Sequence, residues 1–441
     1  MNRWRAVPLA LRVGLILQIL LAAGYAFGVM VVGEHLGADS LASWVRVQLA
    51  VRGGYFVAHA LLLFGALELS HLLVGRAARG AKLAASAWGI LIVADIAVVA
   101  LRLDPDWDLS LLASYVSWGW FVITALVGVG FALAASKRLI IVVLVGAAWL
   151  ILQRPPVLLE WLEHTFAHSP RPLECMFSGI DIAAALMLAA LALVAVADVR
   201  QGFIMPVPQR AREGLGWVAR SLWFRLAGVL VIPLVMLMLS GNGHEDPRLM
   251  MAKAAVVAGF ISIASLIVFG FGALDVARSH HAEVRRWPFL IAAIASLWSA
   301  GVMMTQLPDA YRAAIEHPSG YYHRSVDVYV TSLTLVVPLV TIGSAIAIAL
   351  AISGFAKRRG NFELARRGQN SAILVGTLQL GALVVANILM PAAPSPVGLG
   401  LVILGGVVAG IVALVNVARL AGDGRALVDD VRSALPVAQV V

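Results

Sequence analysis

Residues 9–33 read LALRVGLILQILLAAGYAFGVMVVG, with Arg12 as their one charged side chain. An α-helix rises 1.5 Å per residue, so about 20 apolar residues cross a hydrocarbon core of about 30 Å. Arg3 and Arg5 precede the run, as in a secretory signal, but its apolar part exceeds the roughly 7–15 residues of a signal core. We therefore interpret it as a retained first transmembrane helix.

The rest of the chain repeats this pattern. Of 441 residues, 61% are hydrophobic and 13% are charged, against roughly 25% charged in a soluble domain. The composition predicts an all-α, polytopic integral membrane protein whose first partner is the lipid bilayer. Hydropathy predicts about twelve transmembrane helices, near residues 9–33, 46–75, 83–102, 111–136, 139–153, 176–199, 221–240, 250–278, 287–306, 328–355, 371–390 and 396–419.

The distribution of cations predicts the orientation. The loops on the side of the N-terminus contain 24 of the 33 Lys and Arg residues, as the positive-inside rule expects for cytoplasmic loops. We expect a protein of the cell inner membrane with both termini in the cytoplasm. The net charge of +9 is explained by these loops, and no basic stretch with interleaved aromatic residues predicts a nucleic-acid partner.

Two short segments recur in order along the chain. Phe64–Leu69, FGALEL, returns as Phe271–Val276, FGALDV, at an offset of 207, and 132–136 returns as 349–353 at an offset of 217. Six spans return the chain to the side of the membrane on which it started, so both copies begin on the same side. We therefore infer two parallel six-helix repeats. The predicted parts are a first repeat at 1–200, a basic cytoplasmic linker at 201–220, a second repeat at 221–420 and a cytoplasmic tail at 421–441.

Four ionisable residues fall inside predicted spans, all in the first repeat: Arg52, His59, Asp95 and Asp181. A charge at this depth costs about 2.5–3.5 kcal/mol, so each needs a partner, water or a role. Counted along the helices, Arg52 and the two carboxylates share one level of the outer leaflet, and His59 lies deeper. They form either a hydrated substrate or ion path, or an ion pair that locks three helices together.

The second repeat lacks this cluster. At the offset of 207 it has Gly259 in place of Arg52 and Val302 in place of Asp95. Its intramembrane polar groups are expected to be neutral, chiefly Gln379, Asn387 and Asn416.

External histidines offer a second kind of candidate site. Between Val157 and His168, apolar residues follow one helical stripe and Glu160, His164 and His168 follow another. This pattern favours a short amphipathic helix on the outer membrane surface. His-x-x-x-His also suits Zn or Cu, with Glu160 as a third ligand. No other cofactor is predicted.

No enzyme signature accompanies these features. The repeat and the polar cluster favour a transporter or permease for a small solute or ion. A non-catalytic membrane subunit or sensor, bound to other membrane proteins, is the alternative. A metal-dependent membrane enzyme that uses the external histidines is a third interpretation.

Overall fold

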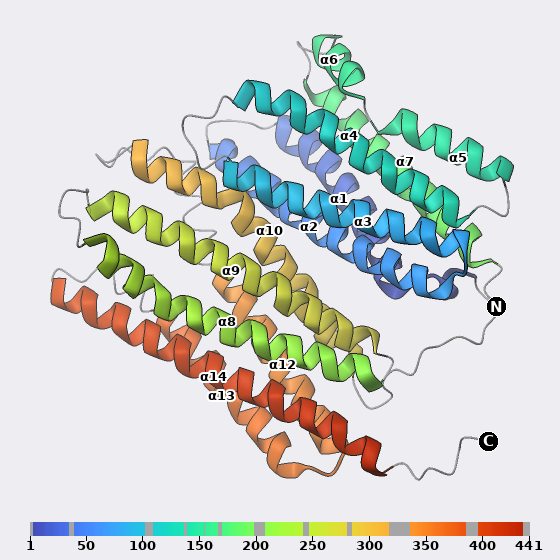
Figure 1. Ribbon diagram of the computed structural model, residues 1–441. Helices are drawn as coiled ribbons and strands as arrows, with labels where there is room; N and C mark the ends of the chain where they lie inside the picture. The colour runs from blue at the N-terminus through green and yellow to red at the C-terminus, as the bar shows by residue number, and fades with distance from the viewer. Residues whose placement is uncertain are drawn as a thin grey trace. The chain divides into compact units, whose positions relative to one another are not determined.

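The computed structural model describes residues 3–34, 39–101, 109–135, 139–153, 155–165, 170–197, 208–240, 247–279, 285–316, 336–384 and 396–434. Every regular element within these ranges is a helix, and none of them contains a strand (Figure 1). The chain divides into two compact units, Met1–Ile204 and Met205–Val441. The prediction of an all-helical protein is confirmed.

The first unit contains a short 3-10 helix, η1 (Arg3–Ala6), and seven α-helices. These are α1 (Leu9–Glu34), α2 (Asp39–Leu72), α3 (Arg76–Leu101), α4 (Leu109–Ala134), α5 (Leu139–Leu152), α6 (Pro156–Thr165) and α7 (Pro170–Val196).

Five of these helices close into a ring. In chain order, α1 packs on α2, α2 on α3, and α3 on α4, and α7 completes the ring by packing on both α4 and α1. The short helix α5 packs on α4 and α7. The five helices of the ring, α2, α3 and α7 among them, therefore share one interior.

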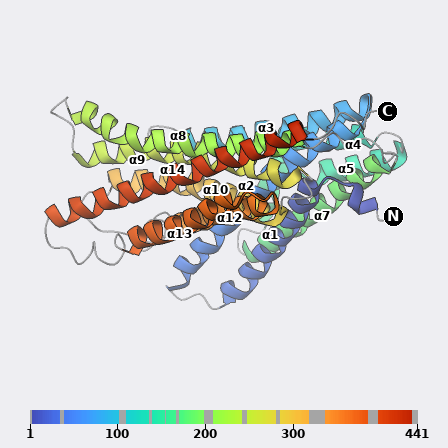
Figure 2. The same cartoon turned by 90° about the horizontal axis from the view of Figure 1, so that it is seen from below.

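The second unit contains six described helices. These are α8 (Pro208–Ser240), α9 (Pro247–Arg278), α10 (Arg286–Glu316), α12 (Val337–Arg358), α13 (Phe362–Val384) and α14 (Pro396–Ala434). Consecutive helices pack on one another, α14 returns to α8, and α12 also contacts α14. Within this unit α8 packs on both α9 and α14 and is seen between them in Figure 1, and Figure 2 shows the same helices from below.

Eight stretches of the described helices are long and apolar enough to cross a membrane. They are Leu9–Met30, Ala50–Leu72, Arg76–Val98, Ser117–Ala134, Cys175–Val196, Val256–Arg278, Arg286–Pro308 and Val337–Arg358. Large apolar side chains on them face outward, among them Phe27 at 65% exposure and Ile291 at 58%. Outward apolar faces on such helices require lipid, so the chain is a multi-pass membrane protein.

The number of twelve spans stays a prediction, because the remaining four fall in α5, α8, α13 and α14 outside these eight stretches. Helix α5 has only 14 residues, fewer than the 17 or so that a crossing helix needs.

Several helices extend beyond the predicted spans. Residues 208–220 of the predicted linker begin α8, and most of the predicted tail continues α14 to Ala434. Helix α10 likewise passes its predicted end at residue 306 and reaches Glu316. Hydropathy detects only the apolar part of a helix, whereas backbone hydrogen bonding continues into polar sequence.

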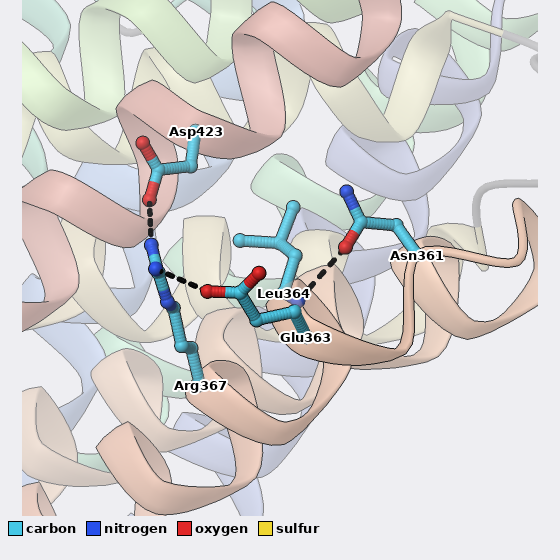
Figure 3. Close-up of polar contacts among 5 residues, drawn as sticks. All are labelled: Asn361, Glu363, Leu364, Arg367 and Asp423. Carbon is cyan, nitrogen blue, oxygen red and sulfur yellow. Dashed lines mark hydrogen bonds and ion pairs between the residues drawn. The ribbon is translucent and has the colours of Figure 1, made fainter.

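The turn between α12 and α13 is fixed by two residues. Gly360 adopts a φ of 75°, a left-handed conformation that glycine accepts without strain. The Asn361 side-chain oxygen accepts a hydrogen bond from the Leu364 amide at 2.9 Å and caps α13. Arg367 then pairs with Glu363 on its own helix and with Asp423 of α14 at 3.7 Å (Figure 3).

Candidate functional site

A hydrogen bond crosses the interior of the first unit. The Tyr55 hydroxyl on α2 donates to a carboxylate oxygen of Asp181 on α7, at 3.2 Å. The backbones of α2 and α7 are not among the closely packed pairs of the ring, so these side chains reach toward each other across its interior.

An aromatic stack lies one turn farther along α2. The ring centres of Tyr55 and His59 are 6.2 Å apart, and those of His59 and Trp88 on α3 are 5.0 Å apart with planes tilted by 33°. Trp88 is only 2% exposed. A continuous polar and aromatic cluster therefore runs from Asp181 of α7, through Tyr55 and His59 of α2, to Trp88 of α3.

Two nitrogens of this stack are buried without a hydrogen-bond partner among the described residues: His59 Nδ1 and Trp88 Nε1. A buried polar group left unsatisfied costs about 1–3 kcal/mol, and nearly all such groups in folded proteins are paired with protein or water. The indole N–H can only donate, whereas an imidazole nitrogen either donates or accepts. The pair is therefore suited to a ligand that carries a hydrogen-bond acceptor.

Arg52 and Asp95 lie on the same helix faces as this stack. Arg52 is seven residues before His59 on α2, and Asp95 is seven residues after Trp88 on α3. Seven residues are two turns, about 10.5 Å, and α2 and α3 run in opposite directions, so both side chains stand two turns from the stack toward the same end. Arg52 is exposed and Asp95 is half-buried.

One contact of Asp181 is defined: its carboxylate accepts a hydrogen bond from the Tyr55 hydroxyl. The ion pair of Arg52 with Asp95 or Asp181, like the hydrated path, stays a prediction.

Gln18 of α1 adds a further polar group at this depth. It is 8% exposed, and its Oε1 has no partner among the described residues. A Cβ on Gly14, one turn before it, would meet Ala58, and Leu21, one turn after it, contacts Gly54. Gln18 therefore lies in the seam between α1 and α2, at the level of Tyr55 and His59.

Apolar side chains fill the opposite part of the same ring. Large buried residues come from the start of α1, the end of α2 and the ends of α4 and α7, where the basic loops attach, and buried alanines come from the start of α3. The large residues include Leu11, Leu15, Leu62, Leu69, Phe131, Leu188 and Leu191. Among the residues whose burial is described, the polar cluster thus lies beyond an apolar core that closes the basic end.

The sequence identified the ionisable members of the cluster and missed Tyr55, Trp88 and Gln18. A signal for the first two was available, because Tyr55 is four residues before His59 and Trp88 seven before Asp95, both same-face spacings. Aromatic side chains are common in membrane helices, so composition alone does not distinguish them.

The external histidine segment forms a helix as expected, α6, with Glu160 and His164 exposed one turn apart. His168 lies outside the described residues. Over the ranges that the structure describes, no group of three or more His, Cys, Asp or Glu side chains converges on a metal-binding point. The metal site at Glu160, His164 and His168 stays a prediction.

Comparisons with models of protein families, with curated proteins and with solved structures found no match to this chain.

Proposed function

We propose that this protein is a transporter or permease that moves a small solute or ion across the bilayer through the first unit. The observation that carries the proposal is the cluster of Asp181, Tyr55, His59 and Trp88, in which two nitrogens buried in membrane-spanning helices have no hydrogen-bond partner among the described residues. Polar and ionisable groups at this depth are costly, and in membrane proteins they mark ion and substrate pathways.

The duplicated architecture supports the same function. Each principal packing pair among α1, α2, α3, α4, α5 and α7 has a counterpart among α8, α9, α10, α12, α13 and α14, taken in chain order. Even the cross-contact of α4 with α7 is matched by that of α12 with α14. We infer that the two units are parallel six-helix repeats, an organisation common in secondary transporters.

Individual contacts follow the offset of 207 seen in the sequence. The α1–α2 pairs are Leu11–Gly65, Gly14–Ala58 and Leu21–Gly54, and adding 207 gives the α8–α9 pairs Val218–Gly272, Ser221–Ser265 and Gly228–Ile261. In the third pair the glycine and the large residue exchange helices. A shared packing register with exchanged residue sizes is expected of two copies that diverged from one ancestor.

In this proposal Asp95 and His59 carry the proton or cation that moves through the first unit. Both side chains are titratable, and they lie on facing helices at successive levels of one interior. Trp88 and Gln18 then supply neutral hydrogen-bonding groups beside them.

Flux measurements in proteoliposomes test the proposal. An imposed pH gradient or Na⁺ gradient would be followed with a trapped pH-sensitive or Na⁺-sensitive dye, for wild type, Asp95→Asn and His59→Gln. We expect flux of one of the two ions above that of protein-free liposomes, and at least a tenfold decrease in Asp95→Asn.

Glu163→Gln is the matched control, because Glu163 is an exposed carboxylate of the same unit outside the membrane-spanning stretches. It is expected to keep wild-type flux. Equal flux in wild type and Asp95→Asn would remove Asp95 from the path. If neither ion moves faster than in protein-free liposomes, the ion path is rejected and a non-catalytic subunit becomes the better account.

A further inference from the structure

Helix α10 of the second unit has a buried polar face that the hydropathy pattern did not reveal. Gln306, placed by sequence at the end of a span, is 0% exposed, and both its Oε1 and Nε2 lack a partner in the described part of the chain. The Ser296 hydroxyl, also 0% exposed, lacks one as well. Both residues fall within the membrane-spanning stretch Arg286–Pro308.

These side chains share one face of the helix. Each residue turns an α-helix by about 100°, so Ser299 lies about 60° from Ser296, and Gln306 about 20° from Ser299. Ser299 is also 0% exposed and donates its hydroxyl to the Ala295 carbonyl at 2.9 Å. Its oxygen still has a lone pair available to accept.

Ser299 and Gln306 turn away from α9, and Ser296 borders the α9 contact. The α10 residues that lie against glycines of α9 include Ala293 and Leu297, at Gly270, and Leu307, at Gly259. Leu307 lies about 20° from the Ser296 direction but about 80° from Ser299 and about 100° from Gln306. Because the three polar residues are fully buried, they face protein and not lipid.

Between Ala292 and Gln306, no charged residue of α10 stands on this face. The other positions that share it are alanine, valine and methionine, and Gln306 offers both a donor and an acceptor. A bare ion would find no opposite charge on this face of α10, whereas an apolar molecule would leave the carboxamide unsatisfied. The chemistry selects a neutral group that donates and accepts hydrogen bonds.

We infer that the α10 face of Ser296, Ser299 and Gln306 is a binding site for neutral hydrogen-bonding molecules, either water or a small uncharged solute with hydroxyl or amide groups. The site belongs to the second unit and is independent of the ionisable cluster in the first. It also gives the two copies different chemistry, charged in one and neutral in the other.

Two neighbouring methionines provide an internal test for such a ligand. Met303 lies within about 20° of the Ser296 direction on the polar face and is half-buried, whereas Met304 is turned about 100° from Met303 and is 3% exposed. Radiolytic labelling of the full-length protein in lipid nanodiscs generates hydroxyl radicals from water in place, and they oxidise adjacent sulfur. We expect Met303 to be oxidised at least fivefold faster than Met304 in wild type.

Gln306→Leu keeps the approximate volume and removes the hydrogen-bonding groups, so it should lower the oxidation of Met303 relative to Met304 severalfold. An unchanged ratio would show that the partial exposure of Met303, and not the site, admits the radicals. Gln379→Leu, a substitution of a partly exposed glutamine on α13, is the control and should leave the ratio unchanged. Equal oxidation of the two methionines in wild type would overturn the site, and this comparison needs no variant to fold.

Proteoliposome swelling separates the two sources of the ligand. Urea supplies an amide probe whose entry is followed by light scattering after an inward urea gradient is imposed. Faster urea entry in wild type than in Gln306→Leu assigns the site to small uncharged solutes, whereas equal entry, with Met303 labelled as expected, assigns it to held water.

Discussion

At the scale of single residues, Tyr55 connects the ionisable cluster of the first unit to its neutral part. Its hydroxyl donates to Asp181 at 3.2 Å, while its ring lies 6.2 Å from that of His59. The hydrogen bond fixes the carboxylate of α7 relative to the stack between α2 and α3. Removing the donor should therefore affect both stability and transport.

We predict that Tyr55→Phe lowers the free energy of unfolding by about 1.5–3 kcal/mol, the usual range for a hydrogen bond to a charged group. A double-mutant cycle with Asp181→Asn, measured by unfolding in mixed micelles, isolates the pair. The coupling energy should exceed about 0.5 kcal/mol. Additive effects of the two substitutions would show that the contact contributes nothing.

The residues that sequence reasoning found and those it missed differ in a physical respect. Arg52, His59, Asp95 and Asp181 stand out because ionisable groups are rare in membrane helices. Gln306 did not stand out, since a glutamine at the end of an apolar run is expected to contact water. Its burial depends on how α10 continues past the apolar run and packs in its unit, which hydropathy does not determine.

At the scale of helices, close approach at glycine sets the register of each unit. A Cβ on Gly65 of α2 would collide with the backbone of Leu11 on α1, and one on Gly272 would lie 2.7 Å from the Gly214 carbonyl oxygen and 2.9 Å from the Val218 nitrogen. Backbone cannot yield as a flexible side chain does. Small residues at such positions allow membrane helices to pack closely.

We predict that Gly65→Ala destabilises the protein by about 1–3 kcal/mol, the cost of overpacking a tight interface. Gly24→Ala on α1 is the matched control, because a Cβ there would meet nothing within 4 Å. It should be neutral or stabilising by up to about 1 kcal/mol. Thermal unfolding in detergent compares the two variants. Equal unfolding midpoints would show that the α1–α2 seam can open at little cost in free energy.

Helix boundaries show where sequence reasoning reached its limit at this scale. Helices were predicted where apolar runs occur, and the described elements occupy those places. Their ends were not predictable, because α8 begins thirteen residues before its predicted span at 221 and α14 passes its predicted end at 419. The backbone groups of the polar and basic residues there form hydrogen bonds within the helix, and the hydropathy of side chains does not report these bonds.

At the scale of the whole molecule, the proposed parallel repeats make a prediction about sidedness. Val74 is 88% exposed and lies just before the turn at Gly75. Adding the offset of 207 gives position 281, which is next to Ala282 in the sequence. Parallel repeats place both positions on one side of the membrane, and the cationic loops around them predict that this side is the cytoplasm. Inverted repeats would place them on opposite sides.

Single cysteines introduced as Val74→Cys and Ala282→Cys test this arrangement, in a background where Cys175, the one cysteine of the chain, is replaced by serine. We expect an impermeant thiol reagent to label both variants in inside-out membrane vesicles and neither in intact spheroplasts. The Cys175→Ser parent should stay unlabelled in both preparations. Labelling of the two variants from opposite sides would contradict parallel repeats. Labelling of both variants only in spheroplasts would reverse the predicted orientation and keep the duplication, because the packing register shared by α1–α2 and α8–α9 does not depend on which side faces the cytoplasm.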